Sequence, residues 1–200
     1  MSPPPLVLAS VSPRRSTLLT MLGLAHEVVP ADLVEALFPG EEPAAHVERL
    51  AREKATLVAV RRPDALVIGG DTIVVLDGEV MGKPARRQEA VAALLRLAGR
   101  EHTVLSGLAV AAPGGAVRAG VSTTRVRFRD FDEPLARRYV ATGEPLDKAG
   151  SYGIQGLGAV LIDSIEGDYH TVVGFPIPVL VRLLEQSGWR YAFGNLEPIS

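Results

Sequence analysis

Residues 6–19, Leu-Val-Leu-Ala-Ser-Val-Ser-Pro-Arg-Arg-Ser-Thr-Leu-Leu, contain the pattern of a short strand, a turn and the start of a helix. The apolar run at 6–8 predicts a buried strand that stops at Ser10. Ser12 is a favoured N-cap residue and Pro13 a favoured first helical residue, so a helix is expected to begin there. Alternation of strands and helices of this kind is typical of α/β folds.

Arg14 and Arg15 fall in the first turn of that expected helix, where the macrodipole already carries about half a positive charge. Two guanidinium groups in this turn cost stability unless an anion compensates them. Helix N–H groups and arginines together form a site for an anion, and phosphate is the favoured ligand. The alternative is that both arginines are solvated at the surface.

The composition excludes several classes of protein. A chain of 200 residues fits one domain, or two lobes around a cleft. The formal net charge of −2 provides no overall basic field for nucleic acid or an anionic membrane. Cysteine is absent, which excludes disulfides and thiol catalysis. No signal-peptide pattern or apolar run of roughly 20 residues occurs, so a cytoplasmic protein without a nucleic-acid or membrane partner is expected.

Further along the chain, strands and helices continue to alternate. Expected strands cover 65–70, 73–76 and 159–163, and a long hairpin joins 104–111 to 117–128. Expected helices cover 43–60, 86–97 and 132–140, with a last helix from Pro176 or Pro178 to about Ser187. Asp77-Gly78 is a hairpin signal, and residues 149–158 are glycine-rich. The pattern predicts an α/β fold.

Lysine is rare, since only three of the 21 basic residues are lysines, at positions 54, 83 and 148. Each is therefore a candidate for a site that needs a compact ammonium group. Lys54 falls within the expected apolar stripe of its helix, so it must extend to solvent or find an anion. That stripe consists of Val47, Leu50, Ala51, Leu57 and Val58. Lys83 lies in a Gly-Lys-Pro turn that suits a lysine reaching toward an anion.

Asp71 is the sharpest catalytic candidate, because it interrupts an apolar run where an unpaired carboxylate is rare. Functional groups in α/β sheets gather at strand ends, and a carboxylate there suits a divalent metal or proton abstraction from water. Glu35, in the loop before the Lys54 helix, is a candidate second metal ligand. The alternatives are a structural Asp71 and an ordinary exposed Glu35.

Gln155 is bracketed by glycines, and its amide offers donors and an acceptor that match the edge of a nucleobase. The histidines (His26, His46, His102 and His170) show no metal-ligand spacing and are interpreted as structural or surface residues. The several cations, offset by Asp71 and Glu35, favour a metal-assisted phosphoryl site and a polyphosphate ligand.

Several sequence blocks, in this order, resemble the Maf family of nucleotide pyrophosphatases over nearly the whole chain. The blocks are ASVSPRR (9–15), RLAREKA (49–55), GGDT (69–72), GKP (82–84), DKAGSYGIQG (147–156), IEGDY (165–169) and VVGFP (172–176). The resemblance implies a single Maf-like domain over 1–200, an elongated mixed-sheet α/β fold of the inosine triphosphate pyrophosphatase type with a cleft between two lobes, and commonly a homodimer.

The resemblance also implies hydrolysis of a nucleoside triphosphate to the monophosphate and pyrophosphate with Mg²⁺ or Mn²⁺. The combination of Pro-Arg-Arg, Asp-Thr and Ile-Gln-Gly is similar to the branch of the family that acts on dTTP and UTP. The implied catalytic residues are Asp71, as proton acceptor, with Lys54 and Lys83. The implied substrate-binding residues are Ser10, Arg14, Arg15, Thr72 and Gln155, and the implied metal ligands are Glu35 and Asp71.

The chain departs from the family pattern at three positions: Val34 stands where an acidic residue usually precedes Glu35, Phe175 replaces the usual leucine, and His170 replaces asparagine or serine. The first departure leaves Glu35 without its acidic neighbour. Two alternatives to a dTTP/UTP pyrophosphatase remain open at this point. One is a nucleotide-binding regulator of septum formation, and the other is the same chemistry on a modified or noncanonical nucleotide.

Overall fold

The computed structural model describes residues 2–199, which fold as two compact units. The first unit comprises the chain up to Asp71, residues 106–122 and the part from Gly174 onward, and the second comprises 72–105 and 123–173. Three long strands supply residues to both units: β3 (Leu66–Leu76), β5 (Glu101–Ala111) and β6 (Val117–Phe128).

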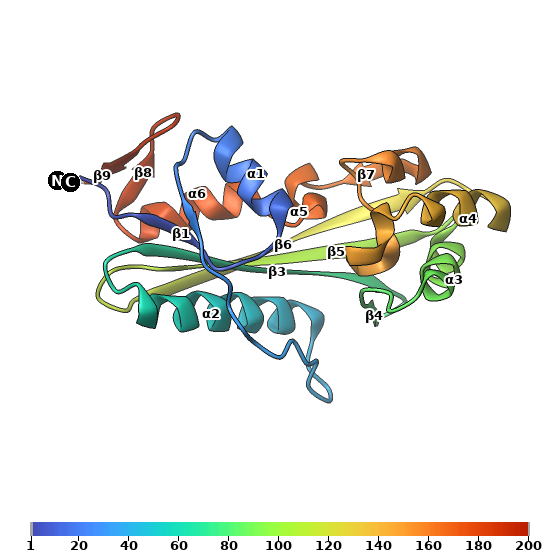
Figure 1. The fold of residues 1–200 in the computed structure, drawn as a ribbon, viewed down its shortest axis with the longest axis horizontal. Helices are drawn as coiled ribbons and strands as arrows, with labels where there is room; N and C mark the ends of the chain where they lie inside the picture. The colour runs from blue at the N-terminus through green and yellow to red at the C-terminus, as the bar shows by residue number, and fades with distance from the viewer. Residues whose placement is uncertain (1, 200) are drawn as a thin grey trace. The chain divides into compact units, whose positions relative to one another are not determined.

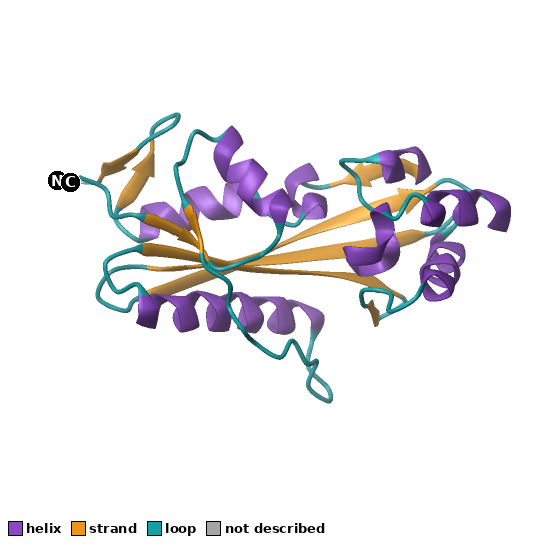
Figure 2. Ribbon diagram, in the orientation of Figure 1, coloured by secondary structure: helices purple, strands orange, loops and turns teal. Residues whose placement is uncertain are grey.

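Strands among the described residues form one mixed sheet in the order β2-β1-β3-β5-β6-β7, with β4 paired to β3 (Figure 2). β1 (Leu6–Leu8) runs parallel to β2 (Glu27–Val28) and to β3. β4 (Glu79–Met81) is antiparallel to β3, and β7 (Ile162–Glu166) is antiparallel to β6. With helices beside the sheet, this arrangement confirms the expected α/β class.

Three helices pack on the sheet strands of the first unit: α1 (Pro13–Met21), α2 (Pro43–Arg61) and α6 (Ile177–Gln186). Figure 1 shows α2 along one face of these strands and α1 and α6 on the other. The unit ends in a hairpin of β8 (Trp189–Tyr191) and β9 (Leu196–Pro198), from which the Tyr191 hydroxyl donates to the carbonyl of Leu22 at 2.9 Å. This bond ties the hairpin to the residue that follows α1.

Small residues allow α2 to lie unusually close to the sheet. Its buried face meets the strands through a cluster made only of alanines and valines, including Ala51 and Ala55. A Cβ atom at Gly69 of β3 would lie 2.2 Å from the Ala51 carbonyl oxygen, and one at Gly107 of β5 would lie 2.5 Å from that of Val47. Both distances are far inside van der Waals contact, so glycine is required at these two positions.

The second unit packs its helices around an aromatic core. Its α-helices are α3 (Arg87–Leu97), α4 (Glu133–Ala141) and α5 (Tyr169–Val173), with 3-10 turns at η1 (Glu144–Asp147), η2 (Ala149–Ser151) and η3 (Leu157–Leu161). Leu94, Phe128 and Tyr152 belong to one buried cluster. The rings of Phe128 and Tyr152 meet edge to face, with centroids 4.7 Å apart.

Local sequence signals predict most of these elements correctly. Helix α1 begins at Pro13 as expected, and the Asp132 carboxylate caps α4 by accepting from the N–H of Leu135 at 3.0 Å. Asp77 and Gly78 both have positive φ, 52° and 81°, as a tight hairpin between β3 and β4 requires.

Three expectations are wrong in detail. Leu57 is 40 % exposed and lies outside the buried face of α2, because that face is completed by Ala55. Residues 159–161 form a 3-10 turn rather than the start of a strand, and β7 begins only at Ile162. Asp71 does not follow the end of a strand but lies inside the continuous strand β3.

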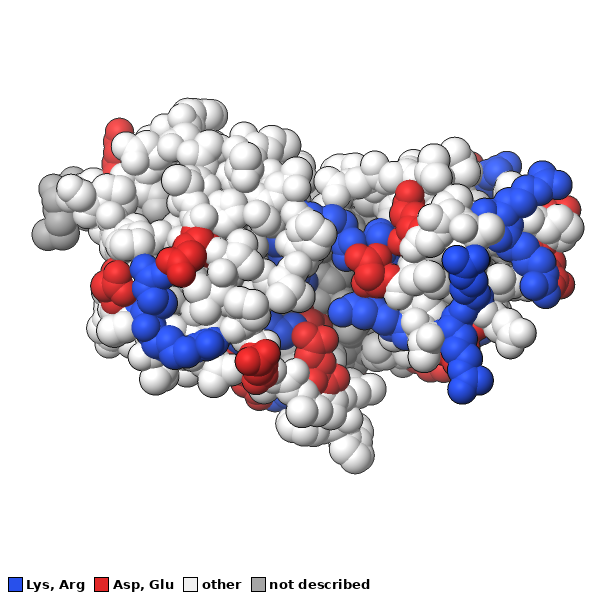
Figure 3. Space-filling view, viewed as in Figure 1, with Lys and Arg blue, Asp and Glu red and all other residues white. Residues whose placement is uncertain are grey.

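The surface carries charges of both signs. Figure 3 shows acidic and basic side chains interspersed on the viewed face, without a continuous basic region over either unit. Within residues 2–199, every helix is too short or too polar to cross a membrane.

Candidate active site

Two buried residues of opposite charge form the centre of the candidate site in the first unit. Lys54 projects from α2 and Asp71 from β3, and the lysine Nζ donates to Asp71 Oδ1 at 2.7 Å. The two residues are only 6 % and 7 % exposed. A buried charge is costly unless it is paired, so each residue requires the other. Lys54 therefore finds an anion rather than extending to solvent.

Glu35 is the third member of this centre. It pairs with the Nζ of Lys54 and comes from the irregular 29–42 segment that joins β2 to α2. Its side chain is 45 % exposed, whereas the side chain of Asp71 is 10 % exposed. One ammonium group thus contacts two carboxylates, one buried and one open to solvent. The sequence-based selection of Lys54, Asp71 and Glu35 brings together residues that the structure places in contact.

The close packing of α2 against β3 explains why Lys54 reaches Asp71. Gly69 lies two residues before Asp71 on β3, so the two residues face the same side of the sheet. The contact of Gly69 with Ala51 brings that turn of α2 against the strand, and Lys54 lies three residues further along the helix. The Gly-Gly-Asp-Thr block therefore has two roles: Gly69 allows α2 to pack closely on β3, and Asp71 supplies the carboxylate.

Arg15 and Arg14 differ in their surroundings, although the sequence treats them alike. Arg15 is 8 % exposed, and its guanidinium donates to the Gly70 carbonyl at 2.6 Å, to Ser10 Oγ at 3.0 Å and to the Gly174 carbonyl at 3.0 Å. Burial lowers the pKa of Arg15, and the negative charge of Asp71 opposes that effect. Arg14 is only partly buried.

Arg15 consequently connects three separate stretches of the first unit around the residue that precedes Asp71. Ser10 lies in the turn after β1, and its Oγ also accepts from the N–H of Ser12 at 3.2 Å. This bond holds the turn from which α1 begins. The strand, turn and helix expected from residues 6–19 thus lead directly to the carboxylate centre.

The other site residues predicted from the sequence, Thr72, Lys83 and Gln155, belong to the second unit. Thr72 follows Asp71 on β3 and is partly buried, whereas Lys83 and Gln155 are exposed. The N–H of Gly150 donates to the Gly82 carbonyl at 3.3 Å, so the turn that carries Lys83 contacts the Gly-rich segment 149–158. The structure brings these two parts of the second unit together.

Glu144 and Tyr139 hold the Gly-rich segment on both sides of Gln155, a role that sequence reasoning missed. The Glu144 carboxylate accepts from the N–H groups of Leu157 at 2.8 Å and Gly158 at 3.0 Å. The Tyr139 hydroxyl donates to Glu144 at 2.8 Å and accepts from the N–H of Gly153 at 3.1 Å. A Gly-Glu-Pro turn just after α4 is the only local signal.

Electrostatics favours this arrangement of Glu144. Desolvation acts to raise the pKa of Glu144, but the hydrogen bonds from Gly158, Leu157 and Tyr139 outweigh it and lower the pKa overall. Burial raises the pKa of Tyr139, and its bond to Glu144 adds to that shift. The Tyr139 hydroxyl therefore stays protonated and donates its hydrogen bond to the Glu144 carboxylate.

Among the four histidines, His102 is the most buried, with 2 % exposure. Its Nε2 lies 2.8 Å from the Tyr152 hydroxyl, and desolvation lowers its pKa to about 4. His26 bonds to Ser16, and His46 to Glu41. In the described part of the chain, no three histidine, aspartate or glutamate side chains group as a metal site.

The fold and the site together define an α/β protein in which arginine, lysine and carboxylate groups gather around Gly70 and Asp71 of strand β3. The chain belongs to the Maf family, because the family model described as "Maf-like protein" matches residues 5–187. The resemblance of the sequence blocks to this family is thereby confirmed.

Relatives of similar length carry a specific name. The dTTP/UTP pyrophosphatase of Symbiobacterium thermophilum is 50 % identical over 184 residues, which cover 92 % of this chain and 94 % of the relative. That of Moorella thermoacetica is 50 % identical over 180 residues, covering 90 % and 93 %. The solved structure of the Staphylococcus aureus Ham1 protein is 17 % identical with a TM-score of 0.44, covering 78 % of this chain and 79 % of that one, a likeness too weak to support an argument.

Proposed function

We propose that this protein hydrolyses dTTP and UTP to the nucleoside monophosphate and pyrophosphate. The names of relatives about half identical over nine-tenths of the chain support this activity. The contact of Lys54 with both Asp71 and Glu35 is the observation in the structure that carries it. It places a carboxylate able to take a proton beside a cation able to bind phosphate.

Asp71 is the proposed proton acceptor. A water oxygen forms a bond to the α-phosphorus while the bond from that phosphorus to the bridging oxygen breaks. The leaving pyrophosphate keeps the electron pair of the broken bond, and the proton of the water passes to a carboxylate oxygen of Asp71. Burial of Asp71 in β3, beside Lys54, fixes the position of that oxygen.

The cations of the site are proposed to bind the triphosphate. Ser10 and Arg14 lie at the start of α1, where the positive end of the helix dipole favours an anion. Lys54 and Lys83 supply compact ammonium groups. Arg15 is proposed to contribute its charge, and its bonds to Ser10 and Gly70 support a bracing role as well. Thr72 and Gln155 are proposed to contact the nucleoside.

A divalent cation, Mg²⁺ or Mn²⁺, fits the carboxylates of Glu35 and Asp71. Oxygen donors are the ligands that these ions prefer, and Mg²⁺ in phosphate sites is commonly held by one or two carboxylates together with substrate phosphates. Both carboxylates share one cationic partner, Lys54, and this supports the proposal that they can hold a cation. When bound, the ion would neutralise phosphate charge and polarise the phosphorus–oxygen bonds.

Pyrophosphate release from a panel of canonical and modified triphosphates, with Mg²⁺ or Mn²⁺, tests the proposal. We expect dTTP and UTP to be the best canonical substrates. Asp71→Asn should lower kcat by about 10²–10⁴-fold, the range for loss of a positioned general base. The matched control is Asp64→Asn, which alters an exposed carboxylate paired with Arg62 and should leave kcat unchanged.

Three outcomes would contradict the proposal. Near wild-type turnover of Asp71→Asn excludes the proton-acceptor role. A clear preference for a modified or noncanonical triphosphate would assign the same chemistry to another substrate. Nucleotide binding without turnover of any triphosphate would favour a nucleotide-binding regulator. A homodimer, a cytoplasmic location and a cleft between two lobes stay predictions.

A further inference from the structure

The 29–42 segment carries Glu35. Val29 and Ala31 pack against the alanine–valine cluster of the sheet, but the part from Val34 onward has little apolar packing of its own. Val34 is 83 % exposed, Leu37 48 % and Phe38 53 %. Between β2 and α2 it forms no helix or strand. A segment of this kind gains little from the hydrophobic effect, so polar contacts must account for its conformation.

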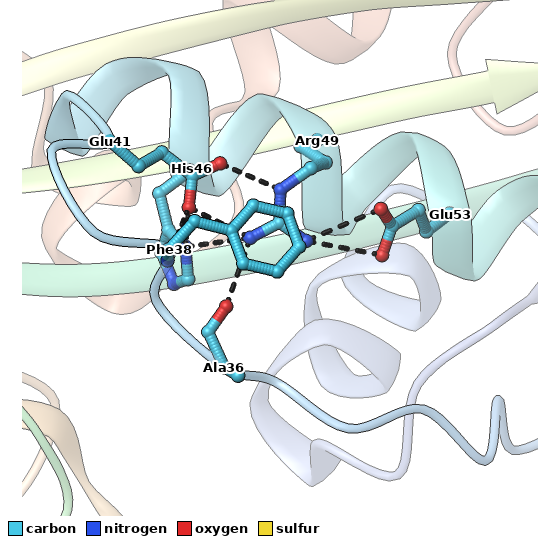
Figure 4. Close-up of polar contacts among 6 residues, drawn as sticks. All are labelled: Ala36, Phe38, Glu41, His46, Arg49 and Glu53. Atoms are coloured by element: carbon cyan, nitrogen blue, oxygen red, sulfur yellow. Dashed lines mark hydrogen bonds and ion pairs between the residues drawn. The ribbon is translucent and has the colours of Figure 1, made fainter.

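Arg49 of α2 supplies more of those contacts than any other described side chain. Its guanidinium makes a bidentate contact with Glu41: Nε donates to Oε1 at 2.6 Å and Nη2 donates to Oε2 at 2.8 Å. Nη2 also donates to the carbonyl of Ala36 at 3.0 Å, and the guanidinium carbon lies 4.0 Å from the centre of the Phe38 ring. Figure 4 shows this side chain enclosed by the segment.

One of these contacts reaches the residue next to Glu35. Ala36 follows Glu35 directly, so the bond to its carbonyl fixes the backbone at the point where the Glu35 side chain leaves it. Glu35 then reaches Lys54, which projects from α2 as Arg49 does. One helix therefore holds both the segment and the partner of its functional carboxylate.

Neighbouring groups hold Arg49 and Glu41 in turn. Glu53 pairs with Arg49 Nη1 at 3.2 Å, from one turn further along α2. His46, 4 % exposed, bonds through Nδ1 to Glu41 Oε2 at 2.9 Å, and the N–H of Phe38 donates to the same oxygen at 3.2 Å. The bond from Arg49, with those from His46 and Phe38, lowers the pKa of Glu41 to about 2. The carboxylate thus stays ionised.

We infer that Arg49 is a positioning residue, which sets Glu35 against Lys54 and Asp71 by fixing residues 36–41. This inference rests on the proposed function, because Glu35 matters only if its carboxylate serves the reaction. The bidentate contact requires arginine. A lysine ammonium cannot donate in one plane to the two carboxylate oxygens of Glu41 and also to the Ala36 carbonyl.

Kinetics of a double-mutant cycle tests whether Arg49 acts through Glu35. Arg49→Ala should lower kcat by about 10–100-fold, because a displacement of about 1 Å at a reacting centre has effects of this size. The KM for dTTP should change less than about threefold, since Ser10 and Arg14 are untouched. In a Glu35→Gln background, Arg49→Ala should cost less than about threefold, because residues acting through one group are not additive.

Arg52→Ala is the matched control. Arg52 lies on the same helix, pairs with Glu48 one turn away and donates to one backbone carbonyl, that of Val117, at 3.2 Å. Within residues 2–199, no hydrogen bond or ion pair joins it to the 29–42 segment. Arg52→Ala should leave kcat within about twofold of wild type. Arg49→Lys and Glu41→Gln, which keep more of the packing, should reproduce the loss of kcat to a smaller extent.

Cleavage by a glutamate-specific protease gives a readout that does not depend on activity. The 29–42 segment contains Glu35, Glu41 and Glu42 but no lysine or arginine. We expect Arg49→Ala to be cut at Glu35 at least about tenfold faster than wild type or Arg52→Ala, while circular dichroism shows an unchanged fold.

The outcomes separate the inference from the proposed function. Wild-type protein that releases no pyrophosphate from dTTP or UTP contradicts the proposed function. Wild-type activity with an unchanged kcat for Arg49→Ala contradicts the positioning role alone. Losses of Arg49→Ala and Glu35→Gln that multiply in the double variant also contradict it, because Arg49 would then act independently of Glu35.

Discussion

The charged centre of the first unit and the Gly-rich segment of the second unit bury polar groups in opposite ways. In the first unit, Lys54 and Asp71 form a buried pair of opposite charge, joined at 2.7 Å. In the second unit, His102 and Tyr152 are buried as neutral partners, and the carboxylate of Glu144 faces backbone N–H groups. The first arrangement keeps charge available for an ionic ligand. The second holds its groups mainly by hydrogen bonds rather than by an opposite charge.

The comparison predicts that acid destabilises the second unit through His102, and this is the largest expected effect. The pKa of His102 is about 4 in the folded protein and about 6.5 in an unfolded chain. Between these values the unfolded chain binds a proton that the folded one does not, so stability falls as the pH falls from 6.5 to 4. The loss should approach about 3 kcal/mol.

Chemical denaturation at several pH values measures this loss. His102→Gln, which does not titrate and keeps a polar group for Tyr152, should remove the corresponding part of the pH dependence. His26→Gln, at a partly exposed histidine, is the control and should retain it. An unchanged pH dependence in His102→Gln would show that burial of neutral groups is not what distinguishes the second unit.

The next effect concerns the close packing behind the charged centre. Gly69→Ala places a methyl group against the Ala51 carbonyl and should lower the free energy of unfolding by about 1–3 kcal/mol. It should also lower kcat, because α2 carries Lys54. Gly120→Ala is the control, since a Cβ there meets only a methyl group of Val179 at 3.2 Å. Equal stability of the two variants in urea titrations would mean that close approach of α2 does not support the centre.

The smallest effect is expected at the Gly-rich segment. Glu144→Gln replaces one carboxylate oxygen by an amide group that cannot accept from a backbone N–H. We expect kcat/KM for dTTP to fall about tenfold, mainly through KM, as one charged hydrogen bond is lost. Hydrolysis rates of dTTP and of a purine triphosphate should then lie closer together. A fall in kcat alone would assign Glu144 to the chemistry rather than to holding Gln155.

The sequence predicts the elements better than their ends and their partners. The strand at 6–8, the start of α1 at Pro13 and the cap at Asp132 depend on neighbouring residues, and the structure confirms them. Residues 159–161 have strand-like composition but form a 3-10 turn, because the bonds from Leu157 and Gly158 to Glu144 bend the chain just before them. That contact joins residues 13 and 14 positions apart and leaves no local pattern.

The site residues likewise fall into those that local sequence predicts and those whose role depends on distant parts of the chain. Rarity of lysine singles out Lys54 and Lys83, and an acid within an apolar run singles out Asp71. Flanking glycines single out Gln155, and only the family blocks single out Ser10 and Thr72. The separate surroundings of Arg14 and Arg15 could not be predicted, because the Gly174 carbonyl that accepts from Arg15 lies 159 residues away. Arg49 could not be singled out either, since an arginine on a helix is ordinary until Glu41 and Ala36 fold against it.

The sequence by itself determined the α/β class, most helices and strands, the family and the chemical types of the site residues. These depend on local propensity, on hydrophobic period and on short blocks of residues. Only the tertiary structure decided that Lys54 finds Asp71 rather than solvent, that Arg15 braces the turn of residues 6–19, and that Arg49 holds the segment carrying Glu35. The physical reason is that a charge acquires its role from the partners packed against it, and those partners come from distant parts of the chain.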